Sequence, residues 1–305
     1  MSIGNRNFQK EEWTNNKKKY KNIALLTSTE EATIEAEKIT KNSKGEVTPD
    51  ILEQELKALD CRTLYKITKD EILDARKKLI NGKSTPKDIK NEMLRYGGDE
   101  LVRYLEVLYN LCYKNKKTPK DWRQGLIKSL HKKGPKDDPS NYRPITLLCP
   151  IGKLYATIIN NRISNHLENN NLLSSSQNGF RTRDSRNCQD HIFTLSEVRK
   201  ICDEHNKELF YAFIDFKSAF DMVPRDAIIS ALLKSGVNLM DVRSVESLYR
   251  HTTARAAFGN QKSREFNILQ GVAQGCPLSP TLFAIFINNL LEKLNMRNEG
   301  IQLKY

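Results

Sequence analysis

Apolar positions recur at helical spacing from residue 48 to about residue 112. Thr48-Pro49 is a capping residue followed by a proline, an order typical of a helix start. Thr68 and Glu71 are spaced as a capping box, ahead of an apolar face formed by Ile72, Ala75, Leu79 and Ile80. A further helix is predicted to begin at Asp99, with inward positions Leu101, Val102, Leu105, Leu108 and Leu111. Residues 48–112 are therefore expected to be mostly α-helical.

Three later segments show the same helical pattern. Residues 152–168 are amphipathic. A second helix is predicted after Pro224, running to about Lys234 and closed by Gly236. Residues 281–294 are strongly apolar and predict a buried helix.

Three other segments favour strands. Residues 209–216, LFYAFIDF, are almost wholly apolar, which predicts a strand buried on both faces. The stretch RQGLIKSLHKK, 123–133, alternates enough for a strand and leads to a Gly134-Pro135 turn, as in a hairpin arm facing phosphates. A second hairpin is expected at 254–269, turning at Gly259-Asn260. Together the patterns predict an α+β fold.

Charge adds a partner to this picture. The 305 residues include 50 Lys or Arg against 37 Asp or Glu, a net charge of +13 that favours a polyanionic partner such as nucleic acid. Residues 114–136 alone carry nine basic side chains against one acid, Asp121. The alternatives are a merely soluble basic protein and, for residues 114–136, an ordinary solvated face.

Several function classes are excluded. No apolar run approaches the roughly 18 residues of a spanning helix, and the polar N-terminus shows no signal peptide, so we expect an intracellular protein that does not contact membranes. The six cysteines lie at least 14 residues apart, which excludes a C-x-x-C metal or redox pair and favours reduced thiols. The segment NGKST at 81–85 lacks the earlier glycine of a phosphate-binding P-loop. No G-x-S-x-G elbow for acyl transfer is present.

Asp215 is the sharpest local anomaly in the sequence. It ends the apolar segment 209–216, where a carboxylate would be desolvated, at a high cost unless it is paired or binds a cation. A metal ligand or an acid–base group would explain it, and so would a side chain that caps the following turn. Asp221, six residues later, is interpreted as an ordinary turn carboxylate.

A second anomaly lies just before the apolar helix at 281–294. Gly271 and Gly275 flank Gln274, and two prolines follow within five residues of Gly275. Glycines let a backbone approach a ligand closely, and Gln274 would present an amide between them. A simple entry into the helix is the alternative, although it would not need two separated glycines around a glutamine.

Five blocks of sequence, in order, resemble the reverse transcriptases. YAFIDFKSAFDMVPRDAI and, further on, GVAQGCPLSPTLFAIFIN resemble the two halves of a palm. DWRQGLIKSLHKKG, NYRPITLLCPIGKLYATIINNRI and SQNGFRTRDSRNCQDHI resemble the fingers blocks. Their order and spacing are most similar to the non-LTR (LINE-like) retrotransposon enzymes, with the group II intron enzymes next.

The resemblance implies a role for each matching residue. Asp215 and the carbonyl of Phe216 would bind Mg²⁺, or Mn²⁺ in its place, while Phe220 would exclude the 2′-hydroxyl of the incoming nucleotide. A core position in a helix is the alternative for Phe220. The residues implied to surround the nucleotide are Gln274, Gly275, Arg143 and one of Lys132 and Lys133, between which the sequence does not decide. Those implied to follow the nucleic acid are Lys128, Gly179, Phe180 and Arg181.

The resemblance also implies the organisation of the chain. It predicts right-hand polymerase fingers and a partial palm at 122–305, an α-helical N-terminal extension at 48–121 and a flexible, basic, linker-like lead at 1–47. The family's third metal-binding segment, an aromatic residue, one further residue and Asp-Asp, is not found before Tyr305. The 305 residues are therefore expected to be truncated before it and inactive alone.

The function implied is an Mg-dependent, RNA-directed DNA polymerase of a retrotransposon. Its partners would be an RNA template, a DNA primer and deoxynucleoside triphosphates, and its site of action would be the nucleus. The alternative is a non-catalytic, nucleic-acid-binding remnant of such an element. A metal-dependent nuclease is a third interpretation, but it would need its own carboxylate cluster and would leave Gln274 without a task.

Overall fold

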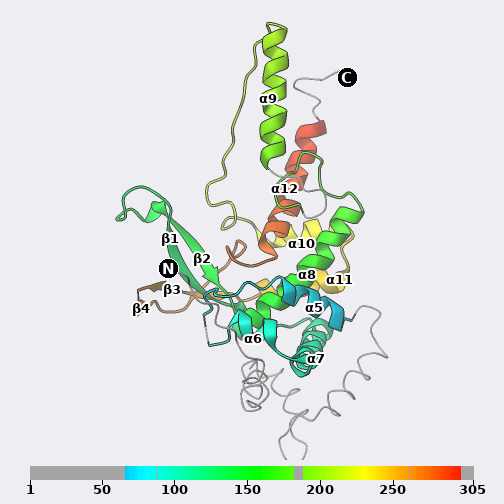
Figure 1. Cartoon of the computed structure of the whole chain (residues 1–305), viewed down its shortest axis with the longest axis vertical. Coiled ribbons are helices and arrows are strands. Elements are labelled where there is room, and N and C mark those ends of the chain that lie inside the picture. The colour runs from blue at the N-terminus through cyan, green and yellow to red at the C-terminus, as the bar shows by residue number, and fades with distance from the viewer. Residues whose placement is uncertain (1–65, 87, 182–187, 260, 297–305) are drawn as a thin grey trace, which may run out of the picture. The chain divides into compact units, whose positions relative to one another are not determined.

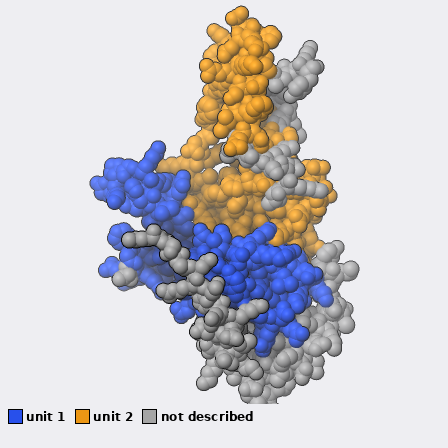
Figure 2. Space-filling model, in the orientation of Figure 1, with its two compact units in different colours: residues 1–158, 243–268 blue, residues 159–242, 269–305 orange. Residues whose placement is uncertain are grey.

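The computed structural model describes residues 66–86, 88–181, 188–259 and 261–296 (Figure 1). The expected lead at 1–47 and the helix expected after Thr48-Pro49 lie outside the described residues. The chain divides into two compact units, coloured separately in Figure 2. Unit 1 contains residues 1–158 and 243–268, and unit 2 contains residues 159–242 and 269–305.

Three helices open the described part of unit 1: α5 (Lys69–Lys77), α6 (Asn91–Tyr96) and α7 (Asp99–Asn115). The predicted capping box is confirmed, because the Thr68 hydroxyl accepts from the Glu71 amide and the Glu71 carboxylate accepts from the Thr68 amide. The apolar face is buried through Leu79, but Ile80 is exposed. The prediction for Ile80 was wrong because α5 ends at Lys77, so Ile80 no longer follows the helical spacing.

The core of unit 1 is aromatic. Tyr109 of α7, Trp122 and Tyr155 are buried, with ring centroids 5.3 to 5.8 Å apart. Their polar atoms are satisfied, as buried polar groups need to be: the Tyr109 hydroxyl donates to the Ile151 carbonyl at 2.9 Å, and the Tyr155 hydroxyl donates to Ser244 at 2.9 Å. Trp122 belongs to the short 3-10 helix η1 (Lys120–Arg123), so the core residues position the strand that follows.

That strand, β1 (Gln124–His131), is the centre of a mixed sheet with the order β2-β1-β3-β4. It pairs antiparallel with β2 (Tyr142–Leu147), after a second 3-10 helix, η2 (Pro139–Asn141), and parallel with β3 (Thr253–Phe258). β3 pairs antiparallel with β4 (Gln261–Lys262) and β5 (Phe266–Asn267). Both predicted hairpins are confirmed by these antiparallel pairs. Gly259 has a positive φ of +55°, and Asn260, the other residue of its predicted turn, lies outside the described residues.

Unit 2 is helical in its described part. It holds the second half of α8 (Pro150–Asn169), then α9 (Cys188–Glu204), α10 (Arg225–Lys234), the start of α11 (Leu239–Tyr249) and α12 (Ser279–Met296). The three later helices predicted from the sequence are thereby confirmed, and Gly236 beyond α10 has a φ of +67°. α10 packs against α12, and residues such as Ile228, Leu232, Leu282 and Ile285 are buried.

The buried strand predicted at 209–216 is not found. These residues form neither helix nor strand, and Phe210 and Phe213 are 86% and 84% exposed. The prediction was wrong because apolar content alone does not make a strand, which also needs neighbours for its N–H and C=O groups. In the part of the chain that the structure describes, no strand pairs with this segment.

Taken together, the described chain is mixed α and β with a sheet of parallel and antiparallel pairs, as the sequence predicted. Among its described helices, none is both long and apolar enough to cross a membrane.

Close backbone packing within unit 2 yields a first prediction. Gly271 has a φ of +82°, and a Cβ added there would lie 2.5 Å from the carbonyl oxygen of Asp221. Gly236 is a matched control, because it also has a positive φ but its added Cβ would meet only the His166 ring at 3.9 Å. Gly236→Ala is expected to lower the free energy of unfolding by about 1–2 kcal/mol, because an alanine Cβ crowds the following carbonyl oxygen in the left-handed region.

Gly271→Ala is expected to cost about 1–3 kcal/mol more than the control, because extra atoms are forced into occupied space. Urea denaturation of the parent protein and both variants measures these differences. An equal loss in the two variants would contradict the prediction and would show that the backbone at Asp221 moves aside freely.

Candidate nucleotide and nucleic-acid site

The basic candidates of unit 1 lie on one hairpin, formed by β1 and β2. Lys128 and Leu130 are two residues apart on β1, so their side chains lie on the same face of the strand. Arg143 of β2 is paired directly opposite Leu130, which places all three residues on one face of the hairpin. Lys128, Lys132, Lys133 and Arg143 are all exposed. The hairpin therefore presents separated positive charges on one face and at its tip, an arrangement suited to phosphates.

The turn of this hairpin is fixed by its own polar groups. The Lys132 amide donates to the Asn141 carbonyl at 2.8 Å, and the Asn141 side-chain amide donates to the Pro135 carbonyl at 2.9 Å. The Tyr142 hydroxyl donates to the Lys136 carbonyl at 2.8 Å. Because the turn is held in this way, the neighbouring lysines extend from a defined backbone. Both Lys132 and Lys133 are exposed at the tip, and the structure does not favour one over the other.

The candidate metal ligands belong to unit 2. Asp215 lies in the irregular segment that ends at Phe216, and it is exposed. The expectation that its carboxylate is desolvated was wrong, because the segment around it is not the buried strand that the apolar pattern predicted. Within the described residues no group of three or more His, Cys, Asp or Glu side chains could hold a metal ion.

Phe220 follows in a tight turn at 217–222. Ser218 has a φ of +52°, and its carbonyl accepts from the amides of Asp221 at 2.9 Å and Met222 at 3.1 Å. The Phe220 ring packs against Phe283 of α12, with centroids 5.2 Å apart, and meets the Phe180 ring at 6.2 Å and 68°. The residue is thus neither in a helix nor in a sealed core, but in a half-buried aromatic cluster.

The two palm-like motifs contact each other through their backbones. The Val272 amide donates to the Phe220 carbonyl at 2.8 Å, and the Gly271 amide donates to the Val223 carbonyl at 2.9 Å. The Arg225 guanidinium donates to the Gly271 carbonyl at 3.1 Å. This pairing places the glycine-flanked loop directly beside the turn that carries Phe220.

Asp221 and Gln274 meet where these motifs touch. The Gln274 side-chain amide donates to both Asp221 carboxylate oxygens, at 3.4 and 3.5 Å. Partial burial raises the pKa of Asp221, and the hydrogen bonds from Gln274 oppose that rise. Sequence reasoning interpreted Asp221 as a turn residue, which it is, but it missed this contact. The glycines around Gln274 indicated that another group approaches this backbone closely, but they did not identify that group as the turn that contains Asp221.

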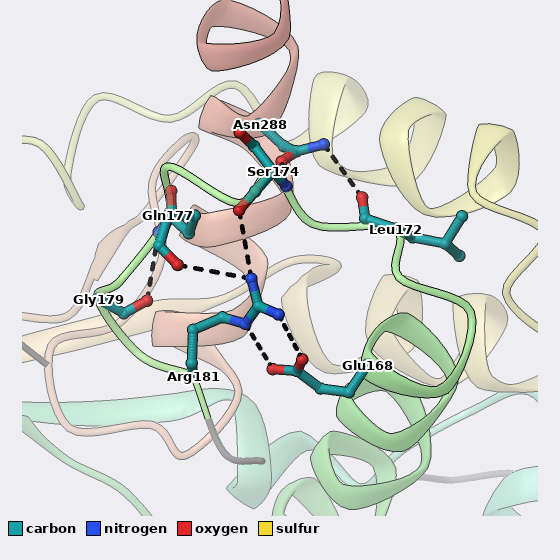
Figure 3. Close-up of polar contacts among 7 residues, drawn as sticks. All are labelled: Glu168, Leu172, Ser174, Gln177, Gly179, Arg181 and Asn288. Carbon is teal, nitrogen blue, oxygen red and sulfur yellow. Dashed lines mark hydrogen bonds and ion pairs between the residues drawn. The ribbon is translucent and has the colours of Figure 1, made fainter. Parts of the chain in front are cut away.

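Arg181 is engaged inside the protein. Its guanidinium donates to both carboxylate oxygens of Glu168, at 2.8 and 2.7 Å, and the two side chains are only 4% and 5% exposed (Figure 3). It also reaches the carbonyls of Ser174 and Gln177, at 3.3 and 3.5 Å. Arg181 was expected to line the template path, but its charge is buried and paired with Glu168. Sequence reasoning missed Glu168, because nothing in the helical pattern of 152–168 marks it as buried.

The same loop is fixed by a second residue that sequence reasoning missed. Asn288 of α12 accepts from the Ser174 amide at 2.7 Å and donates to the Leu172 carbonyl at 3.1 Å (Figure 3). Gln177 donates to the Gly179 carbonyl at 3.3 Å. The signal for Asn288 in the sequence is the asparagine pair Asn288-Asn289 within the apolar segment 281–294, which could have identified it.

The candidates thus fall into two sets. Lys128, Lys132, Lys133 and Arg143 belong to unit 1, and the hairpin gathers them. Those of unit 2 are Gly179, Phe180, Arg181, Asp215, Phe216, Phe220, Gln274 and Gly275. Within unit 2, the structure brings Phe180 to Phe220 and Gln274 to the residue after Phe220.

Comparison with known proteins identifies relatives of the chain. The family described as reverse transcriptase (RNA-dependent DNA polymerase) matches residues 130–305. The probable RNA-directed DNA polymerase from transposon BS of Drosophila melanogaster is 31% identical over 230 residues, 72% of this chain and 24% of that protein. The RNA-directed DNA polymerase from mobile element jockey of the same species is 26% identical over 232 residues, 74% of this chain and 25% of that protein.

A third relative is the retrovirus-related Pol polyprotein from type-1 retrotransposable element R2 of Nasonia vitripennis. It is 27% identical over 190 residues, 62% of this chain and 18% of that protein. The chain therefore spans a quarter or less of the length of these three relatives.

The contact between Gln274 and Asp221 yields the second prediction. Gln274→Ala is expected to raise the pKa of Asp221 further, because the donors that stabilise the carboxylate are removed. Since the folded-state pKa of Asp221 is already raised, its ionisation opposes folding as the pH rises through the unfolded and then the folded pKa. The variant should extend that loss of stability to higher pH.

Carboxyl-carbon NMR titration of Asp221 in the parent protein and the variant measures the change. Gln270→Ala is the matched control, because the Gln270 side chain contacts the Met222 sulfur instead, at 3.6 Å. A titration midpoint for Asp221 that is the same in all three proteins would contradict the prediction.

Proposed function

The chain belongs to the reverse transcriptase family, and we propose that it forms the fingers and part of the palm of an RNA-directed DNA polymerase from a non-LTR retrotransposon. By family it is a nucleotidyltransferase, and its relatives named above come from such elements. The proposed polymerase portion is 122–305, preceded by a helical extension and a basic lead. A nuclear site of action is part of the proposal, because such an element must reach genomic DNA.

The observation that carries this proposal is the pairing between the two palm-like motifs. Two segments about fifty residues apart in sequence are joined by backbone hydrogen bonds at Phe220 and Val223, with Gln274 donating to Asp221. The pairing supports a common site for the residues that the family resemblance assigns to the nucleotide. Phe220 would lie under the sugar, and Gln274 and Gly275 would lie beside the nucleotide and template.

The oxygen donors of unit 2 fit a hard cation. Mg²⁺ commonly binds one or two carboxylates and keeps water and substrate phosphates as its other ligands. The exposed Asp215 carboxylate and the adjacent Phe216 carbonyl would supply the protein donors, for Mg²⁺ or Mn²⁺. Bound there, the ion would activate the 3′-hydroxyl of the primer and neutralise charge on the triphosphate.

The remaining roles fall to positive charges and shape. Arg143 and one of Lys132 and Lys133 would neutralise the triphosphate, the arginine through its planar fork. Lys128 would contact nucleic-acid backbone. Because the Arg181 guanidinium is engaged by Glu168, we propose that contact with the template at this loop involves the Gly179 backbone and the exposed Phe180 ring instead.

We also propose that residues 1–305 do not polymerise by themselves. Asp215 supplies one carboxylate, and Asp221 is turned toward Gln274. Two divalent ions held roughly 4 Å apart need more fixed negative charge than one side chain offers. Binding of nucleic acid without extension would also be the behaviour of a non-catalytic remnant, so a longer form of the protein is needed to distinguish the two.

The third prediction tests this chemistry by primer extension on an RNA template. A longer form that includes the family's Asp-Asp segment is expected to extend the primer, and residues 1–305 alone are not. Asp215→Asn in the longer form should abolish extension, because it removes the carboxylate that binds the cation. Asp226→Asn, the same change at an exposed position in α10, should leave extension intact.

Extension by residues 1–305 alone would contradict the argument about charge. Extension by the Asp215→Asn form would overturn the role of that residue. A longer form that binds the hybrid but never extends would favour the non-catalytic alternative.

The fourth prediction concerns affinity for an RNA–DNA hybrid. Affinity falls as salt rises, and each phosphate contact that is lost reduces the magnitude of the slope of log affinity against log salt by about one. The double variant Lys132→Ala, Lys133→Ala is therefore expected to reduce the magnitude of this slope by about one or two. Binding isotherms between about 50 and 200 mM salt measure the slope. Lys83→Ala with Lys90→Ala removes the same charge elsewhere in unit 1 and should leave the slope nearly unchanged. Equal slopes in both double variants would show that the hairpin tip does not contact phosphate.

A further inference from the structure

Phe180 has a backbone conformation that a bulky side chain rarely adopts. Its φ is +61°, in the left-handed region, and its ring is 55% exposed. A bulky non-glycine residue persists in this conformation only where its surroundings hold it, and such residues gather at functional sites. The residue therefore raises two questions: what holds it, and what the held ring does.

The loop that carries Phe180 is anchored at both ends. At its far end the next residue, Arg181, forms the buried two-point ion pair with Glu168 of α8. At its near end, Asn288 of α12 bonds the backbone of Leu172 and Ser174 (Figure 3). Arg181 also ties the loop to itself through the carbonyls of Ser174 and Gln177. We call residues 172–181 the anchored loop.

The anchored loop places Phe180 against Phe220. The two rings meet edge to face, with centroids 6.2 Å apart and planes at 68°, a favourable geometry for aromatic pairs. On α12, the helix that carries Asn288, Phe283 packs against Phe220 at 5.2 Å. The Phe220 ring therefore packs between two rings, one carried by the anchored loop and one by α12, and Asn288 joins these two elements.

We infer that Phe180 is a positioning residue for Phe220, and that the Arg181–Glu168 ion pair holds Phe180 in that position. Phe180 and Arg181 would then influence the choice between deoxyribose and ribose without touching the nucleotide. This consequence rests on the proposed function, in which Phe220 excludes the 2′-hydroxyl. The positioning itself rests only on the geometry of unit 2.

The first experiment uses residues 1–305 and requires no catalysis. The protein is labelled with 4-fluorophenylalanine, and the Phe220 resonance is assigned by its loss in Phe220→Leu. Phe180→Leu should shift the Phe220 fluorine resonance, because the neighbouring ring is removed. Arg181→Lys keeps the charge but loses the two-point fork, and should shift the Phe220 resonance in the same direction by less.

Phe193→Leu is the matched control for the first experiment. Phe193 is an exposed phenylalanine of α9, so its replacement should leave the Phe220 resonance unchanged. An unchanged Phe220 resonance in Phe180→Leu would overturn the positioning inference. If Arg181→Lys fails to fold, Glu168→Gln weakens the same ion pair while keeping the shape of its side chain, and the same direction of shift is expected.

The second experiment measures single-nucleotide incorporation by a longer, polymerising form. The readout is the ratio of kcat/KM for a deoxynucleotide to that for the matching ribonucleotide. Phe180→Leu should lower this ratio several-fold, in the same direction as Phe220→Ala. In the Phe220→Ala background it should add little, because two residues that act through one group are not additive.

The outcomes separate the inference from the proposed function. An unchanged sugar ratio in Phe180→Leu would overturn the effect of Phe180 on sugar choice, whether or not the variant also weakens the template contact proposed above. If Phe220→Ala itself leaves the ratio unchanged, the role proposed for Phe220 is wrong. The fluorine shifts then decide alone whether Phe180 positions it.

Discussion

The residues proposed for the nucleotide depend on one close approach of two backbone segments. Gly271 lies against the carbonyl of Asp221 with no room for a side chain, and the amides of Gly271 and Val272 complete hydrogen bonds to Val223 and Phe220. Because the two segments touch at the backbone, the side chains on either side are fixed relative to each other. The aromatic ring of Phe220 and the amide of Gln274 owe their common location to this contact.

The buried Arg181–Glu168 ion pair fixes the loop whose Phe180 ring meets Phe220. An arginine and a carboxylate removed from water are stable only when geometry and further hydrogen bonds satisfy them, and the Arg181–Glu168 pair meets both conditions. Removing one partner of such a pair typically costs about 3–5 kcal/mol, far more than an exposed pair contributes. Arg181, which follows a glycine and an aromatic residue, thus fixes a loop in unit 2, whereas the exposed Arg143 of the hairpin remains available to an anion.

Local signals in the sequence predicted local structure well. The Thr68 capping box, the Gly236 helix end and the Gly259 turn depend on neighbours within a few residues, so each could be identified from its own segment. The segment 209–216 could not, because whether an apolar run becomes a strand depends on partners elsewhere. The family resemblance singled out Phe220 and Gln274 as candidates, but it did not single out Glu168, which engages Arg181, or connect Asp221 with Gln274. Long-range polar pairs leave no periodic pattern in a sequence.

The parallel pairing of β1 with β3 has a consequence for the order in which the chain assembles. Gln124 pairs with Thr253, and residues 159–242 of unit 2 lie between those two strands in the sequence. During synthesis the β1–β2 hairpin emerges well before its third strand, so its inner edge waits without a hydrogen-bonding partner. Contacts of such long sequence separation slow folding and leave strand edges open to association with other chains. A ribosome that stalled shortly before β3 would therefore hold a basic hairpin with an open edge outside the exit tunnel.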